Sequence, residues 1–277
     1  MTYKTVLLAV GVPQFQSDLR AVADLCATGN MHLSVLPIKI DTLPPMKDFA
    51  ANLGPWGYDR TSEIEELAEV VKRAREMLSG LGISFDVVGR YAESMWLEHE
   101  VGERAWYADI TLIGPSLKSD ERLRRGVIEG ALFHSARPIL LASNLQSVTL
   151  QPRRILLAWN SSVESARAAR EALDMMRNAE GVNVVMVEPK AASATIGEET
   201  GDCVASYLAR HGVTVTIDRL PGGGRTIAEV LNQHALETGA ELMVMGAYGH
   251  SRVRERVFGG VTKAMIDAPV VPVMMIR

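Results

Sequence analysis

The fold of this chain is decided by residues 242–262, where an apolar run leads into spaced glycines. Residues 242–249 read Leu-Met-Val-Met-Gly-Ala-Tyr-Gly, nine residues follow, and residues 259–262 read Gly-Gly-Val-Thr. The apolar run is typical of a buried parallel strand. Because glycine has no Cβ, the amides of Gly249 and Gly260 can approach an anion closely, and a helix beginning near Gly260 adds its positive end. The spacing therefore predicts a phosphate-binding cradle and nucleotide binding.

Working outward, the same order of segments occurs twice in the chain. Residues 4–10 match residues 154–159, and both segments are followed by a helical pattern rich in Ala, Leu and Arg. Three later pairs keep this order: 81–88 with 211–218, 108–114 with 240–246, and 138–141 with 272–275. Repeats of this length are duplicated domains rather than solenoid units. The sequence predicts a first domain over 1–145 and a second over 151–277.

Within each copy, short apolar runs alternate with segments of helical periodicity, such as 63–78 and 226–237. This alternation predicts right-handed βαβ crossovers and an α/β fold with a mainly parallel sheet covered on both faces. In such open sheets ligands bind outside the carboxyl ends of the strands, where the strand order reverses. Gly246 lies at that kind of position, at the end of the fourth strand of copy two.

Composition narrows the class of protein. The 277 residues are 47% hydrophobic and 22% charged, with a net charge of -4, and this acidic balance argues against nucleic acid or an anionic membrane as a partner. No apolar run approaches the roughly 20 residues that span a bilayer. Cys26 and Cys203 give neither a disulfide framework nor a metal spacing. We expect a cytoplasmic protein with both thiols buried.

The residues 243–252, followed by 258–262, resemble the Gly-x2-Gly-x9-Gly-(Ser/Thr) signature of the universal stress protein family. The whole chain resembles a tandem, two-domain member. The resemblance implies two tandem open α/β sandwiches with five-stranded, mainly parallel sheets, similar to adenine nucleotide α-hydrolases. It also implies a stress-response protein that binds an adenine nucleotide, ATP with or without Mg²⁺, in its second domain as a sensor or regulator.

By the same resemblance, the nucleotide lies between the ends of the first and fourth strands of the second domain. The implied binding residues are Ala158, Asn160, Val187, Gly246, Gly249, His250, Ser251, Gly259, Gly260, Val261 and Thr262. The resemblance further implies that the final strands of the two copies pair into an intramolecular pseudo-dimer. A homodimer between chains is compatible with that arrangement.

The second copy departs from the family pattern at two positions. Asn160 stands where the family has Asp, so it can hydrogen-bond a ribose hydroxyl but brings no charge. Gly260 stands where the family has Ser or Thr, which removes one hydroxyl donor to phosphate. A lost hydrogen bond to a charged group costs about 1.5–3 kcal/mol, roughly ten- to a hundredfold in affinity. Trp159, where a small residue is common, either fills the adenine slot or packs beneath it.

The first copy lacks the pattern. Leu117 replaces the second glycine, Pro115 removes an amide donor, and the ribose position falls near Gly11. We expect this domain to bind no ATP in the family mode and to have a structural role or an unrelated ligand.

The sequence nominates no catalytic residue and no metal site. His99 lacks a second ligand at helical spacing. The glycine-rich segment 221–226 lacks the lysine of a phosphate loop, and the interpretation that Thr226 caps a helix is the simpler one. Besides the nucleotide sensor, two functions stay open: a stress scaffold that acts through protein contacts and binds no nucleotide, and a slow ATPase whose hydrolysis is weak at most.

Overall fold

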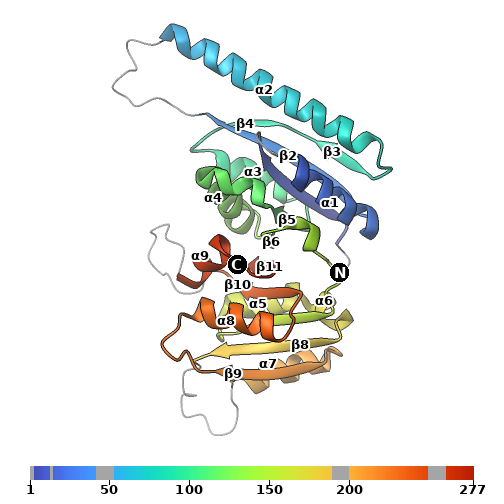
Figure 1. Cartoon of the computed structure of the whole chain (residues 1–277), viewed down its shortest axis with the longest axis vertical. Helices are drawn as coiled ribbons and strands as arrows, with labels where there is room; N and C mark the ends of the chain where they lie inside the picture. The colour runs from blue at the N-terminus through green and yellow to red at the C-terminus, as the bar shows by residue number, and fades with distance from the viewer. Residues whose placement is uncertain (1–2, 13–14, 42–52, 189–199, 249–259) are drawn as a thin grey trace. The chain divides into compact units, whose positions relative to one another are not determined.

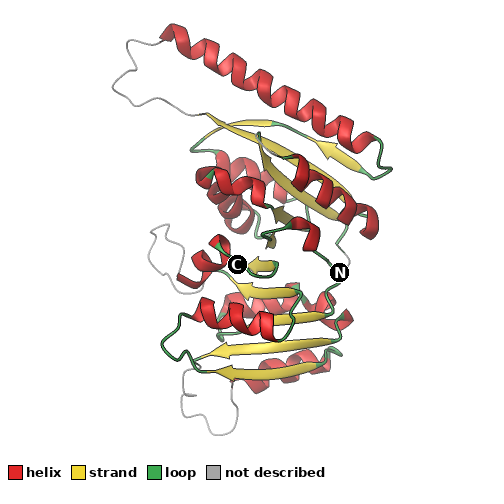
Figure 2. Cartoon of the chain, in the orientation of Figure 1, coloured by secondary structure: helices red, strands yellow, loops and turns green. Residues whose placement is uncertain are grey.

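The computed structural model describes residues 3–12, 15–41, 53–188, 200–248 and 260–277. The chain divides into two compact units, residues 3–139 and 140–277, and strands alternate with helices in each (Figure 1, Figure 2). Among the helices in these ranges, none has the length and apolar character needed to cross a bilayer.

The sheet of the first unit has the strand order β3-β2-β1-β5-β6, with β6 at the boundary of the unit. In this unit β2 is parallel to β1, β3 and β4, and β1 is parallel to β5. Its elements are β1 (Thr5–Gly11), α1 (Gln16–Gly29), β2 (His32–Asp41), α2 (Leu53–Ser79), β3 (Phe85–Val87), β4 (Arg90–Glu93), α3 (Leu97–Ala105), β5 (Ile110–Ile113), η2 (Pro115–Ser119), α4 (Glu121–Glu129), the π-helix η3 (Gly130–His134) and β6 (Ile139–Leu141).

The second unit repeats this arrangement with the order β9-β8-β7-β10-β11, and the four neighbouring pairs are parallel. Its elements are η4 (Leu145–Ser147), β7 (Arg154–Ala158), α5 (Val163–Glu171), α6 (Leu173–Asn178), β8 (Gly181–Val187), α7 (Thr200–Arg210), β9 (Val215–Leu220), α8 (Ile227–Glu237), β10 (Leu242–Gly246), α9 (Gly260–Asp267) and β11 (Val273–Ile276). The predicted α/β fold class is confirmed, with one difference: the outer position of the first sheet is split between β3 and β4.

The central strands are apolar throughout because helices cover both faces of a doubly wound sheet. In β1, residues 6–11 are all buried, and in β10 residues 242–245 are buried. A glycine also follows the corresponding helix in each copy. Gly82 and Gly212 have φ values of 65° and 81° and follow α2 and α7, and such left-handed residues end helices readily when they are glycine.

The helices of the first unit approach each other closely at glycines. A Cβ on Gly130 would lie 2.6 Å from the carbonyl oxygen of Glu98, and Gly102 and Gly126 face His134 and Leu97 in the same way. No larger residue fits without a shift of backbone or side chains. These glycines therefore let α3 pack against α4 and η3.

Candidate functional site

The carboxyl edge of the second sheet brings several predicted residues together. In the strand register Ala158 of β7 lies between Val185 of β8 and Met245 of β10. Val187 and Gly246 are the last residues of β8 and β10. Ala158, Val187 and Gly246 therefore lie on one edge, where open parallel sheets bind ligands.

Trp159 follows β7 at this edge. Its backbone amide donates to the carbonyl of Val185 at 2.9 Å, which extends the β7–β8 ladder by one residue. Its side chain is half-buried, and the indole Nε1 is buried with no hydrogen-bond partner in the described part of the chain. A buried donor without an acceptor costs about 1–3 kcal/mol. Because Nε1 is buried, a ligand atom could accept from it only after the indole turns toward the edge.

Asn160 is exposed and shapes the turn that follows β7. Its Oδ1 accepts from the backbone amide of Ser162 at 3.2 Å, and Ser161 has a positive φ of 60°. Ser162 in turn caps α5 by accepting from the amide of Ser165 at 3.1 Å. An aspartate could form the same turn. The amide at Asn160 therefore keeps the local geometry while it removes the negative charge.

Gly246 has a packing role that the sequence did not indicate. A Cβ on this residue would lie 2.5 Å from the carbonyl carbon of Glu164 and 2.6 Å from the backbone nitrogen of Ser165. Glycine is thus required where β10 meets the first turn of α5. The next residue, Ala247, is fully buried, and its amide donates to the carbonyl of Ile276 at 2.7 Å.

On the phosphate side of the predicted site, α9 is described from Gly260 onward, and the residues before it lie outside the described ranges. No described heavy atom lies within 4 Å of a Cβ built on Gly260, so the position has room for a side chain. Val261 is half-buried and Thr262 is 5% exposed. The hydroxyl of Thr262 therefore belongs to a buried side chain. Gly249, His250, Ser251 and Gly259 lie outside the described residues.

The glycine-rich segment 221–226 lies beside the end of β8. A Cβ on Gly222 would lie 2.7 Å from Cδ of Glu188, the residue after Val187. Thr226 caps α8 in a reciprocal pair with Glu229, which confirms the interpretation of Thr226 as an N-cap. The guanidinium of Arg225 donates to Oε1 of Gln233 at 2.5 Å, so this cation is held against α8.

In the first domain, the segment that matches the cradle is closed. Leu117 is 1% exposed and fills the interior where the second copy has Gly249. The backbone amide of Ser116 donates to Oδ2 of Asp18 at 3.0 Å, and Pro115 has no amide hydrogen to offer. The predicted loss of the phosphate cradle in this copy has a clear physical basis here.

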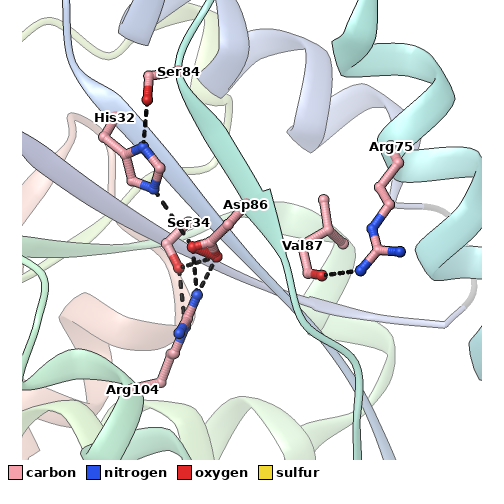
Figure 3. Close-up of polar contacts among 7 residues, drawn as sticks. All are labelled: His32, Ser34, Arg75, Ser84, Asp86, Val87 and Arg104. Atoms are coloured by element: carbon pink, nitrogen blue, oxygen red, sulfur yellow. Dashed lines mark hydrogen bonds and ion pairs between the residues drawn. The ribbon is translucent and has the colours of Figure 1, made fainter.

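A second polar cluster lies at the opposite, amino-terminal edge of the first sheet (Figure 3). Nδ1 of His32 lies 2.8 Å from the Ser84 hydroxyl, and its Nε2 lies 3.4 Å from Oδ2 of Asp86. Ser, His and Asp are also the residue types of a catalytic triad. Here, however, the carboxylate of Asp86 accepts from the guanidinium of Arg104 on α3, which also donates to Ser34 at 3.0 Å. The cluster ties α3 to the sheet.

The second domain has a similar polar cluster between its outer strand and a helix. Oδ2 of Asp218 on β9 accepts from Nδ2 of Asn183 on β8 at 2.8 Å and lies 2.9 Å from Nε2 of His234 on α8. Each domain thus links an aspartate on its outer strand to a basic side chain on the following helix. The two clusters are structural parts of the duplicated fold.

The described residues contain no group of three or more His, Cys, Asp or Glu side chains placed to hold a metal ion. The clearly shifted pKa values in this part of the chain belong to Cys26, Arg60, Tyr91, Glu129 and Glu229. Groups tuned for acid or base chemistry cluster at catalytic sites. The first four of these groups belong to the first unit, and Glu229 lies in the first turn of α8, where hydrogen bonds with the capping residue Thr226 cause its shift.

Similarity to known proteins fits this geometry. Residues 152–277 match the model of the universal stress protein family. The second half of this chain is a universal stress protein domain. The first domain repeats its strand order, so the chain is a tandem of one fold.

Solved structures agree over nearly the full length. A universal stress protein from Archaeoglobus fulgidus DSM 4304 is 15% identical, with a TM-score of 0.70, over 98% of this chain and 96% of that one. A Pseudomonas aeruginosa UCBPP-PA14 protein assigned to the same family is 15% identical, with a TM-score of 0.61, over 99% and 93%. At these identities the likeness establishes the fold alone.

One universal stress protein was solved in complex with cAMP; it is 19% identical and covers 52% of this chain and 99% of its own, with a TM-score of 0.32. That likeness is too low to bear on the ligand of this chain. A search of curated proteins gives no match.

Proposed function

We propose that the second universal stress protein domain, residues 151–277, binds an adenine nucleotide, ATP with or without Mg²⁺, and acts as a sensor or regulator in the cytoplasmic stress response. The observation that carries the proposal is the buried indole Nε1 of Trp159, without a partner in the described residues, at the carboxyl edge of the sheet. A purine ring offers several acceptor nitrogens. A base lying over the carboxyl ends of β7 and β10 would cover the edge and, with the indole turned toward it, accept from this donor.

The phosphate end of the site would be formed by α9 and the residues before it. The positive end of a helix attracts anions, and no described atom lies within 4 Å of a Cβ built on Gly260. The missing hydroxyl at Gly260 weakens the site. Replacing Gly260 with Ser adds a donor without meeting a described atom, so we expect Gly260→Ser to bind ATP about tenfold more tightly.

The test is isothermal titration of ligand-stripped protein with MgATP. Trp159→Phe keeps an aromatic ring but removes the Nε1 donor, and should weaken ATP binding about tenfold. The matched control is Trp106→Phe in the first domain, whose Nε1 donates to the carbonyl of His134 at 2.7 Å, and this variant should bind ATP like the wild type. Equal affinity in Trp159→Phe and the wild type, or no binding at millimolar ATP, would refute the proposal.

The second candidate is a stress scaffold that binds no nucleotide, and Gly246 favours it. Because Gly246 is required by the packing of β10 against α5, this glycine needs no ligand to explain it. The two functions differ in the titration above. A scaffold gives no heat of binding with MgATP in the wild type, in Trp159→Phe or in Trp106→Phe. A slow ATPase would bind ATP and also release phosphate over many turnovers.

A further inference from the structure

Large apolar side chains of the first domain gather on the outer face of α3. Leu97, Val101 and Ala105 of this helix are buried, and the opposite face is exposed. The exposed large apolar side chains at the two ends of the helix are Met95 (76%), Trp96 (54%), Trp106 (46%) and Tyr107 (78%). Singly exposed apolar residues are common on protein surfaces, whereas a group of them marks a site of interaction.

Two histidines connect the ends of this face. The ring of His99 on α3 lies 6.3 Å, between centroids, from the ring of Trp96 and also from that of His134 on η3. Nε1 of Trp106 donates to the carbonyl of His134 at 2.7 Å. η3 is a π-helix, and such elements are frequent at functional sites. We call this continuous surface the α3 surface; it consists of Met95, Trp96, His99, Trp106, Tyr107 and His134.

The size of the α3 surface suits a short segment of a partner. An aromatic side chain buries about 150–250 Å² in a core or interface, so the four large apolar side chains, at their exposed fractions, present on the order of 500 Å². A standard interface between two proteins buries about 800 Å² of each. The surface is therefore large enough for a peptide segment and small for a contact between two copies of this chain.

The charge beside the α3 surface is negative. Oε1 of Glu103 lies 3.2 Å from Nε2 of His99, and Oε2 of Glu98 lies 3.5 Å from Nε2 of His134. Glu98 also shares a hydrogen bond with Glu129, whereas the side chain of Glu103 is 48% exposed. Within the described ranges, neither Glu98 nor Glu103 forms an ion pair with a lysine or an arginine. Glu103 is thus the carboxylate that a partner can reach most easily.

The arginines of α3 and of the strand before it are already bound to other carboxylates. Nε of Arg90 lies 3.0 Å from Oε2 of Glu100, and the guanidinium of Arg104 donates to Asp86 on the sheet. A cation for Glu103 would therefore come from a partner. Cations are also attracted to the faces of Trp and Tyr rings. The charge and the aromatic side chains thus favour the same chemical group in the ligand.

We propose that the α3 surface binds a short segment of a partner protein in which an arginine or a lysine lies among apolar residues. The cation would meet Glu103 and the ring of Trp106, which is its neighbour three residues further along the helix. The apolar residues of the segment would cover Trp96 and Met95. Trp and Tyr are typical of the residues that carry most of the binding energy in interfaces. This surface lies in the first domain and does not depend on nucleotide binding in the second.

The experiment measures fluorescence anisotropy of two short labelled peptides with the full chain. Both peptides alternate leucine with a charged residue, which is arginine in one and glutamate in the other. We expect the arginine peptide to bind at least about tenfold more tightly than the glutamate peptide. Trp96→Ala should weaken binding of the arginine peptide about tenfold, and Glu103→Gln about threefold.

Helix α8 of the second domain offers matched controls. Glu237 is also an exposed glutamate beside a histidine, with Oε2 3.8 Å from Nδ1 of His234, and Leu236 is 62% exposed. Glu237→Gln and Leu236→Ala should bind the arginine peptide like the wild type. The proposal is overturned if the arginine peptide does not bind, if both peptides bind equally, or if Trp96→Ala and Leu236→Ala bind the arginine peptide equally. A wild-type dimer in sedimentation that Trp96→Ala abolishes would assign the surface to a second copy and would also overturn it.

Discussion

The two domains share one strand order and differ at the carboxyl edge of the sheet. In the second domain, the Nε1 of Trp159 after β7 has no hydrogen-bond partner among the described residues, and no described atom lies within 4 Å of a Cβ built on Gly260 in α9. In the first domain, Leu117 is buried at the matching place and the nearby amide of Ser116 is bound to Asp18. Because the sheet itself is preserved, the two copies differ in the residues after its first and fourth strands.

The difference extends to charge. The first domain has a cavity at the carboxyl ends of β1 and β2 with three carboxylates in its lining, whereas the second-domain edge has Asn160 where the family carries an acid. The equivalent edges of the two sheets thus carry different side chains. The predictions below test how far the two copies differ.

The largest expected difference concerns the two thiols, one in each domain. Burial raises the pKa of Cys26 to about 12, whereas Cys203 is exposed. Because only the thiolate reacts, Cys203 should react with an aromatic disulfide reagent at neutral pH at least about a hundredfold faster than Cys26. Cys203→Ser should remove the fast phase. A wild-type protein with two fast thiols would contradict the burial of Cys26.

The next effect is on folding of the second domain. Gly246→Val forces a β-branched side chain against the backbone of Glu164 and Ser165, which should lower the free energy of unfolding by roughly 3 kcal/mol. Gly260→Ala has space for its methyl group and is the control. Urea denaturation of both variants measures the difference. Unchanged stability in Gly246→Val would show that β10 and α5 are not in close contact.

The contacts Asp86–Arg104 and Asp218–His234 should differ in how much they contribute to the stability of their domains. The side chains of Asp218 and His234 are 23% and 15% exposed, against 37% and 28% for Asp86 and Arg104. We expect His234→Ala to cost about 1–3 kcal/mol of stability and Arg104→Ala about 1 kcal/mol, because the more exposed charges are better solvated. Arg153→Ala, which removes the exposed contacts to Glu180 and Glu241, should cost less than either. The reverse order would show that burial does not set their strength.

The smallest effects are on the pH dependence of stability. Burial raises the pKa of Glu129, helped by Glu98 and opposed by Arg125. Between its ordinary and its raised pKa, unfolding releases a proton from Glu129, so its contribution to stability falls as pH rises through this window. Glu129→Gln should remove that slope from a series of urea denaturations.

In the second domain, Glu229 should change stability with pH in the opposite direction. Hydrogen bonds from Thr226 lower the pKa of Glu229. Its contribution is therefore present above the ordinary pKa of a glutamate and is lost as pH falls through the lowered value. Glu229→Gln should make stability less sensitive to acid. Slopes of the same sign at both glutamates would contradict the two environments.

Much of the fold could be predicted because it depends on local sequence patterns. The paired apolar runs, Gly82 and Gly212 at equivalent helix ends, and Thr226 as a cap depend on residues close in sequence. The site depends on contacts between distant segments. The role of Gly246 is set by α5, about 80 residues away, and no pattern near Gly246 signals it.

Two further features were missed for the same reason. The first-domain cavity requires that residues from β2, η2 and α4 meet, and Leu117 was read only as the loss of a glycine. The expectation that both thiols are buried was wrong for Cys203, which is exposed on α7. A cysteine in a helix can lie on either face, and one residue type does not determine which.

The most direct test of the difference between the domains is the stoichiometry of MgATP binding to ligand-stripped full-length protein, measured by isothermal titration. We predict one site per chain, weakened by Trp159→Phe and unaffected by Ser119→Trp in the first-domain cavity. Two sites per chain, or a single site that is lost in Ser119→Trp and retained in Trp159→Phe, would contradict the account.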